Sequence, residues 1–181
     1  MYKHLRFLKG VAFAAEKHKH QRRKDVAASP YINHLIAAAN VLAKEGNVTD
    51  EDLLLAAILH DAVEDTETSF AEVEEQFGKS VADIVREATD DKTLPKAERK
   101  RLQEETAPHA SSWAKQLKIA DKICNIRDIV HNPPAHWPIE RKREYLLWTI
   151  RVVAGCRGVN ALLDRAFDET IRDAAGHLGM E

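Results

Sequence analysis

Cysteine and long hydrophobic runs are scarce in this sequence of 181 residues. Its two cysteines, Cys124 and Cys156, are too few for a disulfide framework, and neither belongs to a C-x-x-C pair typical of structural zinc sites. No apolar run approaches the roughly 20 residues that span a bilayer. Charged residues interrupt the first 24 positions, so a continuous hydrophobic export signal is absent. We therefore expect a cytoplasmic protein with no membrane partner.

The chain also lacks a large excess of either charge, because 27 basic and 29 acidic residues leave a formal net charge of −2. This balance argues against a nucleic-acid partner, since domains that bind nucleic acids are usually strongly basic. The basic residues nevertheless gather in two segments, at 17–24 and 92–101. Each segment is either a solvated helix face or part of a binding site for a small polyanion, and composition alone leaves both interpretations open.

The alternation of apolar and polar residues that marks strands is absent, whereas helical spacing recurs along the whole chain. Spacing and cap residues predict helices at about 4–23, 31–44, 50–65, 70–77, 81–89, 111–131, 139–156 and 159–177, with a basic segment after Pro95. Ser69 and Ser80 are expected to cap the fourth and fifth of these helices. We predict one all-α domain over residues 1–181, a compact bundle of roughly eight to ten helices.

The strongest chemical signal follows the apolar run 53–59, which has no polar face and is therefore expected to be buried. Directly after this run, within two helical turns, come His60, Asp61, Glu64 and Asp65. Ionisable groups that lead out of a buried helix are costly unless a cation compensates them. Imidazole and carboxylate are both good ligands for divalent ions. The alternative is a helix end that reaches solvent, where these acids need no partner.

The predicted helix 111–131 carries a second signal at Asp121. Apolar residues lie on two sides of this helix, so we expect it to be central and Asp121 to point into the protein. A buried aspartate needs a cation, a paired base or several hydrogen-bond donors. A metal ion would satisfy it, and so would a structural salt bridge to a residue such as Lys118 or Arg127. Asn125, one turn further on, is expected beside the carboxylate.

His34 is the remaining candidate ligand, at the edge of the apolar face of the predicted helix 31–44. A single histidine at such a position is usually a satisfied core residue. Here it accompanies a His-Asp pair and Asp121, which lie on separate predicted helices. Two imidazoles and two carboxylates can hold one divalent ion and leave positions for water and a substrate oxygen.

These candidate ligands match the pattern of a known family. The H…HD…D pattern of the HD superfamily of metal-dependent phosphohydrolases is similar to the series formed here by His34, His60-Asp61 and Asp121. The resemblance narrows with the motifs QRRKD at 21–25, PYINH at 30–34, ILHDAVEDT at 58–66, TDDKTLP at 89–95, ERKRLQ at 98–103, APHASSWAK at 107–115 and ADKICNIRD at 120–128. Together they resemble the small alarmone hydrolases, which are the metazoan SpoT homologues and their bacterial relatives.

The resemblance implies hydrolysis of the 3′-pyrophosphate of guanosine tetra- or pentaphosphate, the alarmone of the stringent response, to GDP or GTP and pyrophosphate. It implies a single manganese ion (Mn²⁺) per chain, with the ligands His34, His60, Asp61 and Asp121. Water activation and proton handling are implied for the acidic pair of the HDxVED motif, Glu64 and Asp65. The residues implied to contact the nucleotide are Arg23, Lys24, Lys96, Asn125, Arg127 and Tyr145.

Two alternative functions are compatible with the same residues. One is a phosphatase acting on another 2′- or 3′-phosphorylated nucleotide such as NADPH, which would use the same metal and basic side chains. The other is an alarmone-binding module without catalysis, although the Glu64-Asp65 pair beside the metal motif argues against it. Ligand types alone also permit iron, zinc or other divalent ions. The sequence leaves a monomer and a homo-oligomer both open.

Overall fold

Helices make up most of residues 3–180, the part of the chain that the computed structural model describes. In these residues there are ten α-helices and one 3₁₀ helix: α1 (Lys3–Lys17), α2 (Ile32–Lys44), α3 (Glu51–Leu59), α4 (Ala62–Asp65), α5 (Phe70–Phe77), α6 (Lys79–Ala88), α7 (Lys96–Thr106), η1 (Ala107–His109), α8 (Ser112–His131), α9 (Ile139–Ala154) and α10 (Ala161–His177). Two isolated β-bridges are the only sheet-like pairing within residues 3–180. The prediction of an all-α fold is confirmed.

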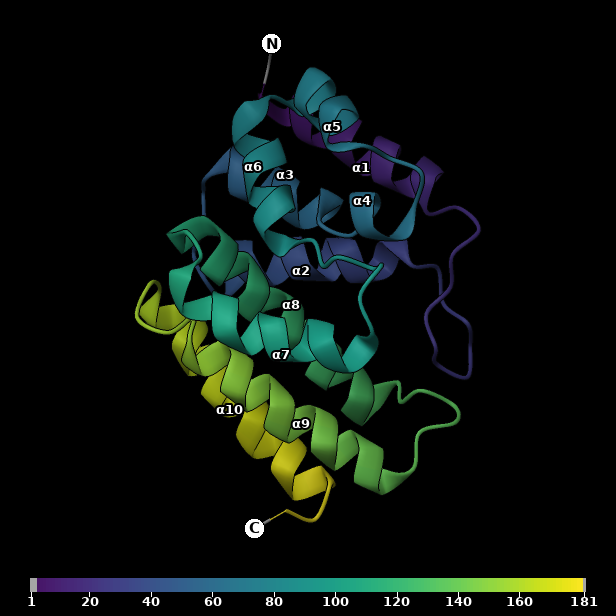
Figure 1. The fold of residues 1–181 in the computed structure, drawn as a ribbon, viewed down its shortest axis with the longest axis vertical. Coiled ribbons are helices and arrows are strands. Elements are labelled where there is room, and N and C mark those ends of the chain that lie inside the picture. The colour runs from purple at the N-terminus through teal and green to yellow at the C-terminus, as the bar shows by residue number, and fades with distance from the viewer. Residues whose placement is uncertain (1–2, 181) are drawn as a thin grey trace.

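The central element is α8, which packs against α2, α3, α6, α9 and α10. Figure 1 shows α1, α3, α5 and α6 at one end of the molecule and α9 and α10 at the other, with α2 and α8 between them. The apolar residues on two sides of α8 explain this position, since Leu117, Ile119 and Ile123 are all fully buried. Asp121 therefore lies on a helix that is enclosed by its neighbours.

α3 is buried as predicted, and Asp50 caps it by accepting a hydrogen bond from the backbone N–H of Leu53 at 3.0 Å. The helix does not continue to Asp65, however. It ends at Leu59, and α4 begins at Ala62 after a break. The backbone of Asp61 (φ −96°, ψ −2°) lies in the sparsely populated bridge region, where many active-site residues are found. The break thus falls at the predicted His-Asp ligand pair.

α1 ends at Lys17, earlier than predicted, and the segment that follows is not helical. Residues 21–30 form an arm that is closed by an antiparallel bridge between Arg22 and Pro30. Backbone groups in the arm pair with one another across this bridge, so they need no helix to satisfy them. A second bridge ties the arm to the loop 132–138.

Two further boundaries differ from the prediction. α6 begins at Lys79 with Gly78 (φ 91°) as its N-cap, so Ser80 lies inside the first turn and does not cap the helix. α7 occupies the basic segment after Pro95, where only a charged segment was expected. None of its residues is fully buried, so it lacks the apolar spacing that would have predicted a helix.

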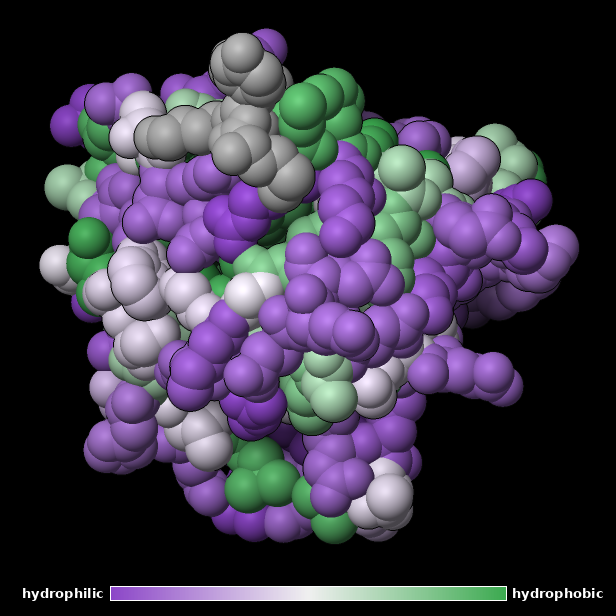
Figure 2. Space-filling model, turned by 90° about the horizontal axis from the view of Figure 1, so that it is seen from above, coloured by the Kyte–Doolittle hydropathy of each residue, from purple (hydrophilic) through white to green (hydrophobic). Residues whose placement is uncertain are grey.

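The surface is mostly polar. Figure 2 shows hydrophilic side chains over most of the face seen from above, with apolar side chains in separate patches. Exposed apolar residues scattered in this way are normal for a protein surface. Among residues 3–180, no helix has the length and apolar character needed to cross a membrane.

Candidate metal centre and substrate cavity

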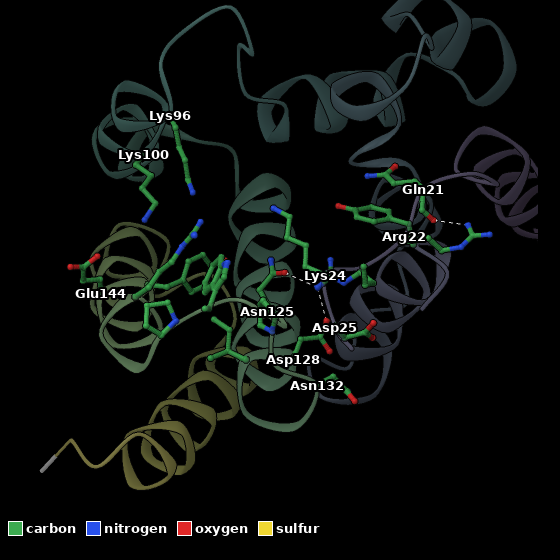
Figure 3. A pocket seen from close by; sticks show the side chains of 18 of the residues that line it. Gln21, Arg22, Lys24, Asp25, Lys96, Lys100, Asn125, Asp128, Asn132 and Glu144 are labelled. Atoms are coloured by element: carbon green, nitrogen blue, oxygen red, sulfur yellow. Dashed lines mark hydrogen bonds and ion pairs between the residues drawn. The ribbon is translucent and has the colours of Figure 1, made fainter. Parts of the chain in front are cut away.

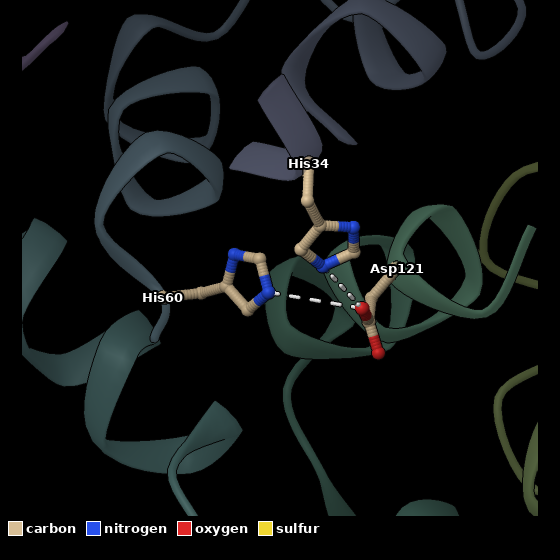
Figure 4. A group of neighbouring side chains, drawn as sticks. All are labelled: His34, His60 and Asp121. Atoms are coloured by element: carbon tan, nitrogen blue, oxygen red, sulfur yellow. Dashed lines mark ion pairs between the residues drawn. The ribbon is translucent and has the colours of Figure 1, made fainter. Parts of the chain in front are cut away.

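Three side chains from separate helices meet inside the molecule: His34 from α2, His60 from the end of α3 and Asp121 from α8 (Figure 4). One potential ligand atom from each lies within 4.8 Å of the others. His34 Nε2 is 3.1 Å and His60 Nε2 is 3.7 Å from Asp121 Oδ1. Both imidazoles are buried. Two nitrogen donors and one oxygen donor thus converge, as the binding of a divalent ion requires.

The orientation of His60 fits a metal ligand. Its Nδ1 is 2.8 Å from the carbonyl oxygen of Ala57, which can only accept, so Nδ1 donates a proton there and Nε2 is the ring nitrogen available to a metal ion. His60 Nε2 is buried and has no hydrogen-bond partner within residues 3–180, which is costly unless a cation binds it. Burial alone would lower the pKa of His60, but the carboxylates of Asp61 and Asp121 raise it to about 9. These carboxylates favour positive charge at the point where a metal ion would bind.

Asp61 lies beside this cluster but is partly engaged elsewhere. Its Oδ2 is 3.3 Å from His60 Nε2 and 3.9 Å from His34 Nε2. The same oxygen accepts a hydrogen bond from the Tyr31 hydroxyl at 2.7 Å. Asp61 does not belong to the group whose ligand atoms all lie within 4.8 Å of one another. Its role as a fourth ligand therefore stays a prediction, with Tyr31 as the residue that orients its carboxylate.

The two oxygens of Asp121 have different partners. Oδ1 faces the histidines and accepts a hydrogen bond from Asn125 Nδ2 at 2.7 Å, whereas Oδ2 lies 3.1 Å from Lys122 Nζ. Burial alone would raise the pKa of Asp121, but Lys122 and the two histidines hold it well below its usual range. The lysine partner is Lys122, and not Lys118 or Arg127. A salt bridge and a cluster of metal-binding atoms therefore coexist on one carboxylate.

Glu64 enters the same space. A cavity of about 140 Å³, here called the metal cavity, is lined by the two histidines, Asp61, Asp121 and Glu64 among others. Glu64 Oε2 accepts a hydrogen bond from the backbone N–H of Asp90 at 3.1 Å, and Oε1 lies 3.7 Å from Arg99 Nη1. Burial, aided by neighbouring carboxylates, raises the pKa of Glu64. A carboxylate of this kind is suited to accept a proton from water.

Asp65 faces a different space from its neighbour in the sequence. It accepts hydrogen bonds from Gln21 Nε2 at 2.7 Å and from Lys92 Nζ, and it does not line the metal cavity. Burial alone would raise the pKa of Asp65, but these two donors lower it. The acids of the HDxVED motif therefore have opposite pKa shifts and separate surroundings. This separation favours Glu64 for proton transfer, and the part implied for Asp65 in water activation stays a prediction.

A second cavity of about 820 Å³, here called the large cavity, opens beside the metal cavity (Figure 3). Tyr31 and Asn125 line both cavities, so the two spaces adjoin. Figure 3 shows Lys96 on one wall, Lys24 nearer the arm and Asn125 on α8 between them. Of the six residues predicted to contact the nucleotide, five line the large cavity: Arg23, Lys24, Lys96, Asn125 and Tyr145.

Basic side chains crowd the large cavity. Six of them line it: Arg22, Arg23, Lys24, Lys96, Lys100 and Arg141. Burial, followed by repulsion from Arg141 and Lys24, lowers the pKa of Lys96. Burial and repulsion from Lys96 likewise lower the pKa of Lys100. A bound polyanion would relieve this repulsion, so the cavity is suited to a ligand with several phosphate groups.

The sixth residue predicted to contact the nucleotide, Arg127, lies away from both cavities, so its contact with the substrate stays a prediction that its position does not support. Its guanidinium donates two hydrogen bonds to the carboxylate of Glu45, at 2.6 and 2.7 Å. It lines a separate hollow near α10 and neither of the two cavities. The reason is helical phase, because Arg127 is two residues beyond Asn125 and so points to the opposite side of α8.

His18 and Gln21 were not among the predicted site residues, yet they contact residues that line the two cavities. His18 is buried, its Nδ1 lies 2.5 Å from Gln21 Oε1, and its ring stacks on Tyr31 with centroids 5.2 Å apart. Arg23 lies over the same tyrosine ring, 5.4 Å from its centroid. The available signal was position, since Gln21 begins the QRRKD motif and His18 lies three residues before it.

Comparison with known proteins agrees with this geometry. The family model described as HD domain matches residues 10–146. A protein of Xenopus tropicalis named guanosine-3′,5′-bis(diphosphate) 3′-pyrophosphohydrolase MESH1 is 52% identical over 166 residues, which cover 92% of this chain and 93% of that protein. The Homo sapiens protein of the same name is 52% identical over 159 residues, covering 88% of this chain and 89% of that one.

Solved structures show the same relationship. One, described as a metazoan ortholog of SpoT that hydrolyzes ppGpp, is similar with a TM-score of 0.90 and 48% identity, over 93% of this chain and 94% of that one. A protein of Listeria monocytogenes has a TM-score of 0.66 and 29% identity, over 81% and 99% of the two chains. The family implies a divalent metal, and the convergent donor atoms and the unpaired His60 Nε2 fit one. The chain therefore belongs to the HD domain family and is an HD-domain hydrolase.

Proposed function

We propose that this chain hydrolyses the 3′-pyrophosphate of guanosine tetra- and pentaphosphate in a manganese-dependent reaction, releasing pyrophosphate and GDP or GTP. The names of relatives that are 52% identical to it support this substrate. The structural observation that carries the proposal is the junction of a cation-lined large cavity with a small cavity containing metal-binding atoms.

The sizes of the two cavities suit the two parts of such a substrate. Small-molecule sites usually measure about 300–1,000 Å³, and the large cavity of about 820 Å³ falls in this range. The metal cavity, about 140 Å³, is too small for a nucleoside but has room for phosphate groups. A nucleotide in the large cavity would therefore direct its 3′-pyrophosphate past Tyr31 and Asn125, which line both spaces.

Hydrolysis forms a bond between a water oxygen and the phosphorus that carries the 3′ oxygen, and it breaks the bond between that phosphorus and the 3′ oxygen. Water loses a proton, and the 3′ oxygen leaves with one as a hydroxyl. Glu64 is placed to accept the proton, because it lines the metal cavity and burial raises its pKa. Manganese, when bound by His34, His60, Asp61 and Asp121, would supply a Lewis acid that polarises water and a phosphoryl oxygen.

The basic residues neutralise the phosphates and orient the nucleotide. Arg23 is held by Asp128 Oδ2 at 2.5 Å and by Asn125 Oδ1 at 3.1 Å, so its guanidinium is already in place at the cavity wall. Lys24 and Lys96 repel each other across the cavity, and a phosphate between them would remove this repulsion. These side chains bind and position the substrate, whereas Glu64 handles the proton.

The test is a substrate comparison with manganese-loaded protein. Guanosine tetraphosphate is incubated with the protein, and GDP and pyrophosphate are separated and quantified, with chelator-stripped protein and the Asp121→Asn variant as controls. We expect both products in equal amounts, only with metal and only from the wild-type chain. NADPH is assayed in parallel. Hydrolysis of NADPH with the tetraphosphate left intact would replace the proposed substrate with a phosphate monoester, and loss of neither compound would refute the proposed reaction.

Three further expectations belong to the same proposal. We propose that residues 1–181 form one domain and that the protein acts in the cytoplasm on a small nucleotide, with no nucleic-acid partner. Proteolysis that yields a single resistant fragment would support one domain, whereas two stable fragments would contradict it. Light scattering would decide between a monomer and a homo-oligomer.

A further inference from the structure

Lys118 on α8 reaches the metal cavity and has no role in the reaction described above. Its side chain is almost buried, with 8% of the residue exposed. It lines the metal cavity and also a further hollow of about 380 Å³ between α6, α7 and η1. Lys118 therefore borders the metal cavity without bordering the large cavity.

The charge of Lys118 is poorly compensated among the described residues. Burial lowers its pKa, and Lys122, which is one helical turn away, lowers it further; Asp90 and Asp121 act on it only through space. Both carboxylates have other partners, because Asp90 Oδ2 accepts from Gln103 Nε2 at 2.6 Å and Asp121 Oδ2 lies 3.1 Å from Lys122 Nζ. A buried ammonium group without a close anionic partner is costly, so an anion bound beside it would be stabilising.

We propose that Lys118, together with Lys122, forms a subsite for the terminal phosphate of a pyrophosphate group, either on the substrate or in the free product. The proposal rests on the proposed function, which brings a 3′-pyrophosphate into the metal cavity. The phosphate attached to the ribose would lie near the metal ligands, and the second phosphate would extend inward to the two ammonium groups. On hydrolysis the inorganic pyrophosphate leaves from this position, while the nucleoside diphosphate remains in the large cavity.

This subsite would confer specificity. A phosphate monoester, such as the 2′-phosphate of NADPH, has no second phosphate to reach Lys118. The energy from that contact is thus available only to a pyrophosphate ester or to inorganic pyrophosphate. Lys118 is predicted to distinguish pyrophosphate esters from monoesters, whereas the cations of the large cavity bind both.

Direct binding tests the subsite without relying on turnover. Trace ³²P-labelled pyrophosphate is dialysed to equilibrium against manganese-loaded wild-type protein and against Lys118→Met, which replaces the ammonium with apolar atoms of similar length. The matched control is Lys115→Met on the same helix, where Nζ donates to the Pro108 carbonyl at the surface (2.9 Å). We expect Lys118→Met to weaken pyrophosphate binding at least about tenfold, or about 1.4 kcal/mol, with Lys115→Met and the affinity of GDP little changed.

A second comparison separates substrate from product. In a Glu64→Gln background, where turnover is suppressed, the affinities of guanosine tetraphosphate and of its 3′-monophosphate analogue are measured with and without Lys118→Met. The tetraphosphate should lose its advantage over the analogue when Lys118 is replaced. If only free pyrophosphate loses affinity, the subsite serves the product.

Several results would overturn the proposal. Unchanged pyrophosphate affinity in Lys118→Met would do so, and so would an equal loss of GDP affinity, which would indicate a general collapse of the site. Thermal unfolding checks the variant, and Lys118→Gln is used if the methionine variant does not fold. If neither variant folds, Lys118 is required for the core and is not a ligand-binding residue. Wild-type protein that binds pyrophosphate through Lys118 but does not hydrolyse the tetraphosphate would refute the proposed function alone.

Discussion

Replacing Glu64 with glutamine is predicted to separate catalysis from metal binding. The change removes one negative charge but keeps the length of the side chain and an oxygen that can accept the hydrogen bond from the Asp90 N–H. Glu64 is not one of the atoms that converge with His34, His60 and Asp121. The variant should therefore retain its metal. Loss of a general base typically lowers kcat by about 10²–10⁴-fold, and we expect a loss in this range.

The pH dependence of the same variant gives a second readout. Only the ionised carboxylate accepts a proton, and burial raises the pKa of Glu64. Wild-type activity should fall as the pH is lowered through this raised pKa, and Glu64→Gln should lack that acidic limb. Because the pKa is higher in the folded state, any stability that Glu64 contributes is present at low pH and lost as the pH rises through that value. At neutral pH the uncharged glutamine should leave the melting temperature unchanged or higher.

Steady-state kinetics under saturating manganese, with metal content measured on the same samples, would provide the test. Glu67→Gln is the matched control, because it makes the same chemical change at an exposed position three residues further along the chain. We expect the control to keep wild-type kcat and pH profile. A Glu64→Gln enzyme that retains both metal and wild-type kcat would refute the role of Glu64 in proton transfer.

Three other substitutions test the site at its centre, behind it and away from it. Asp121→Asn should reduce bound metal by more than about tenfold in elemental analysis, since it removes the carboxylate that both histidines face. One metal ion per chain in this variant would contradict the assignment of Asp121 as a ligand. Tyr31→Phe removes the donor to Asp61 Oδ2 and should weaken metal affinity about 10–100-fold in chelator competition, whereas full affinity would mean that this bond is unimportant. Arg127→Ala should leave KM unchanged and cost less than about 1 kcal/mol in denaturant unfolding, because its ion pair with Glu45 is partly exposed; a raised KM would restore a substrate role.

The parts of the fold that follow from the sequence are those with a strong buried pattern. α3 and α8 have apolar residues around much of their circumference, and both lie in the core as predicted. α7 has no fully buried residue, so nothing in its apolar spacing distinguished it from a charged loop. The end of α1 was placed too late because residues 18–23 are compatible with a helix locally, and only pairing with residues further along the chain opposes it.

The candidate site divides in the same way. Asp121 and His34 could be assigned because a polar residue in a buried pattern needs a partner, and the structure brings both beside His60. The break between α3 and α4 could not be foreseen, whereas Glu64 and Asp65 line different cavities because they are successive residues of α4 and so point in different directions. Arg127 was grouped with Asn125 by motif, whereas the helical phase of α8 separates them.

The bridge between the arm (residues 21–30) and the loop 132–138 makes one wall of the large cavity sensitive to changes in loop length. The bridge between Asp25 and Pro134, with the bond from the Ala135 N–H to the Lys24 carbonyl at 3.0 Å, joins segments that are distant in sequence into one wall of the large cavity. A deletion or insertion in either loop would shift Lys24 even though the lysine itself is untouched. A change in the length of the 132–138 loop is therefore predicted to move this wall of the large cavity while leaving Glu64 and the candidate metal ligands in place.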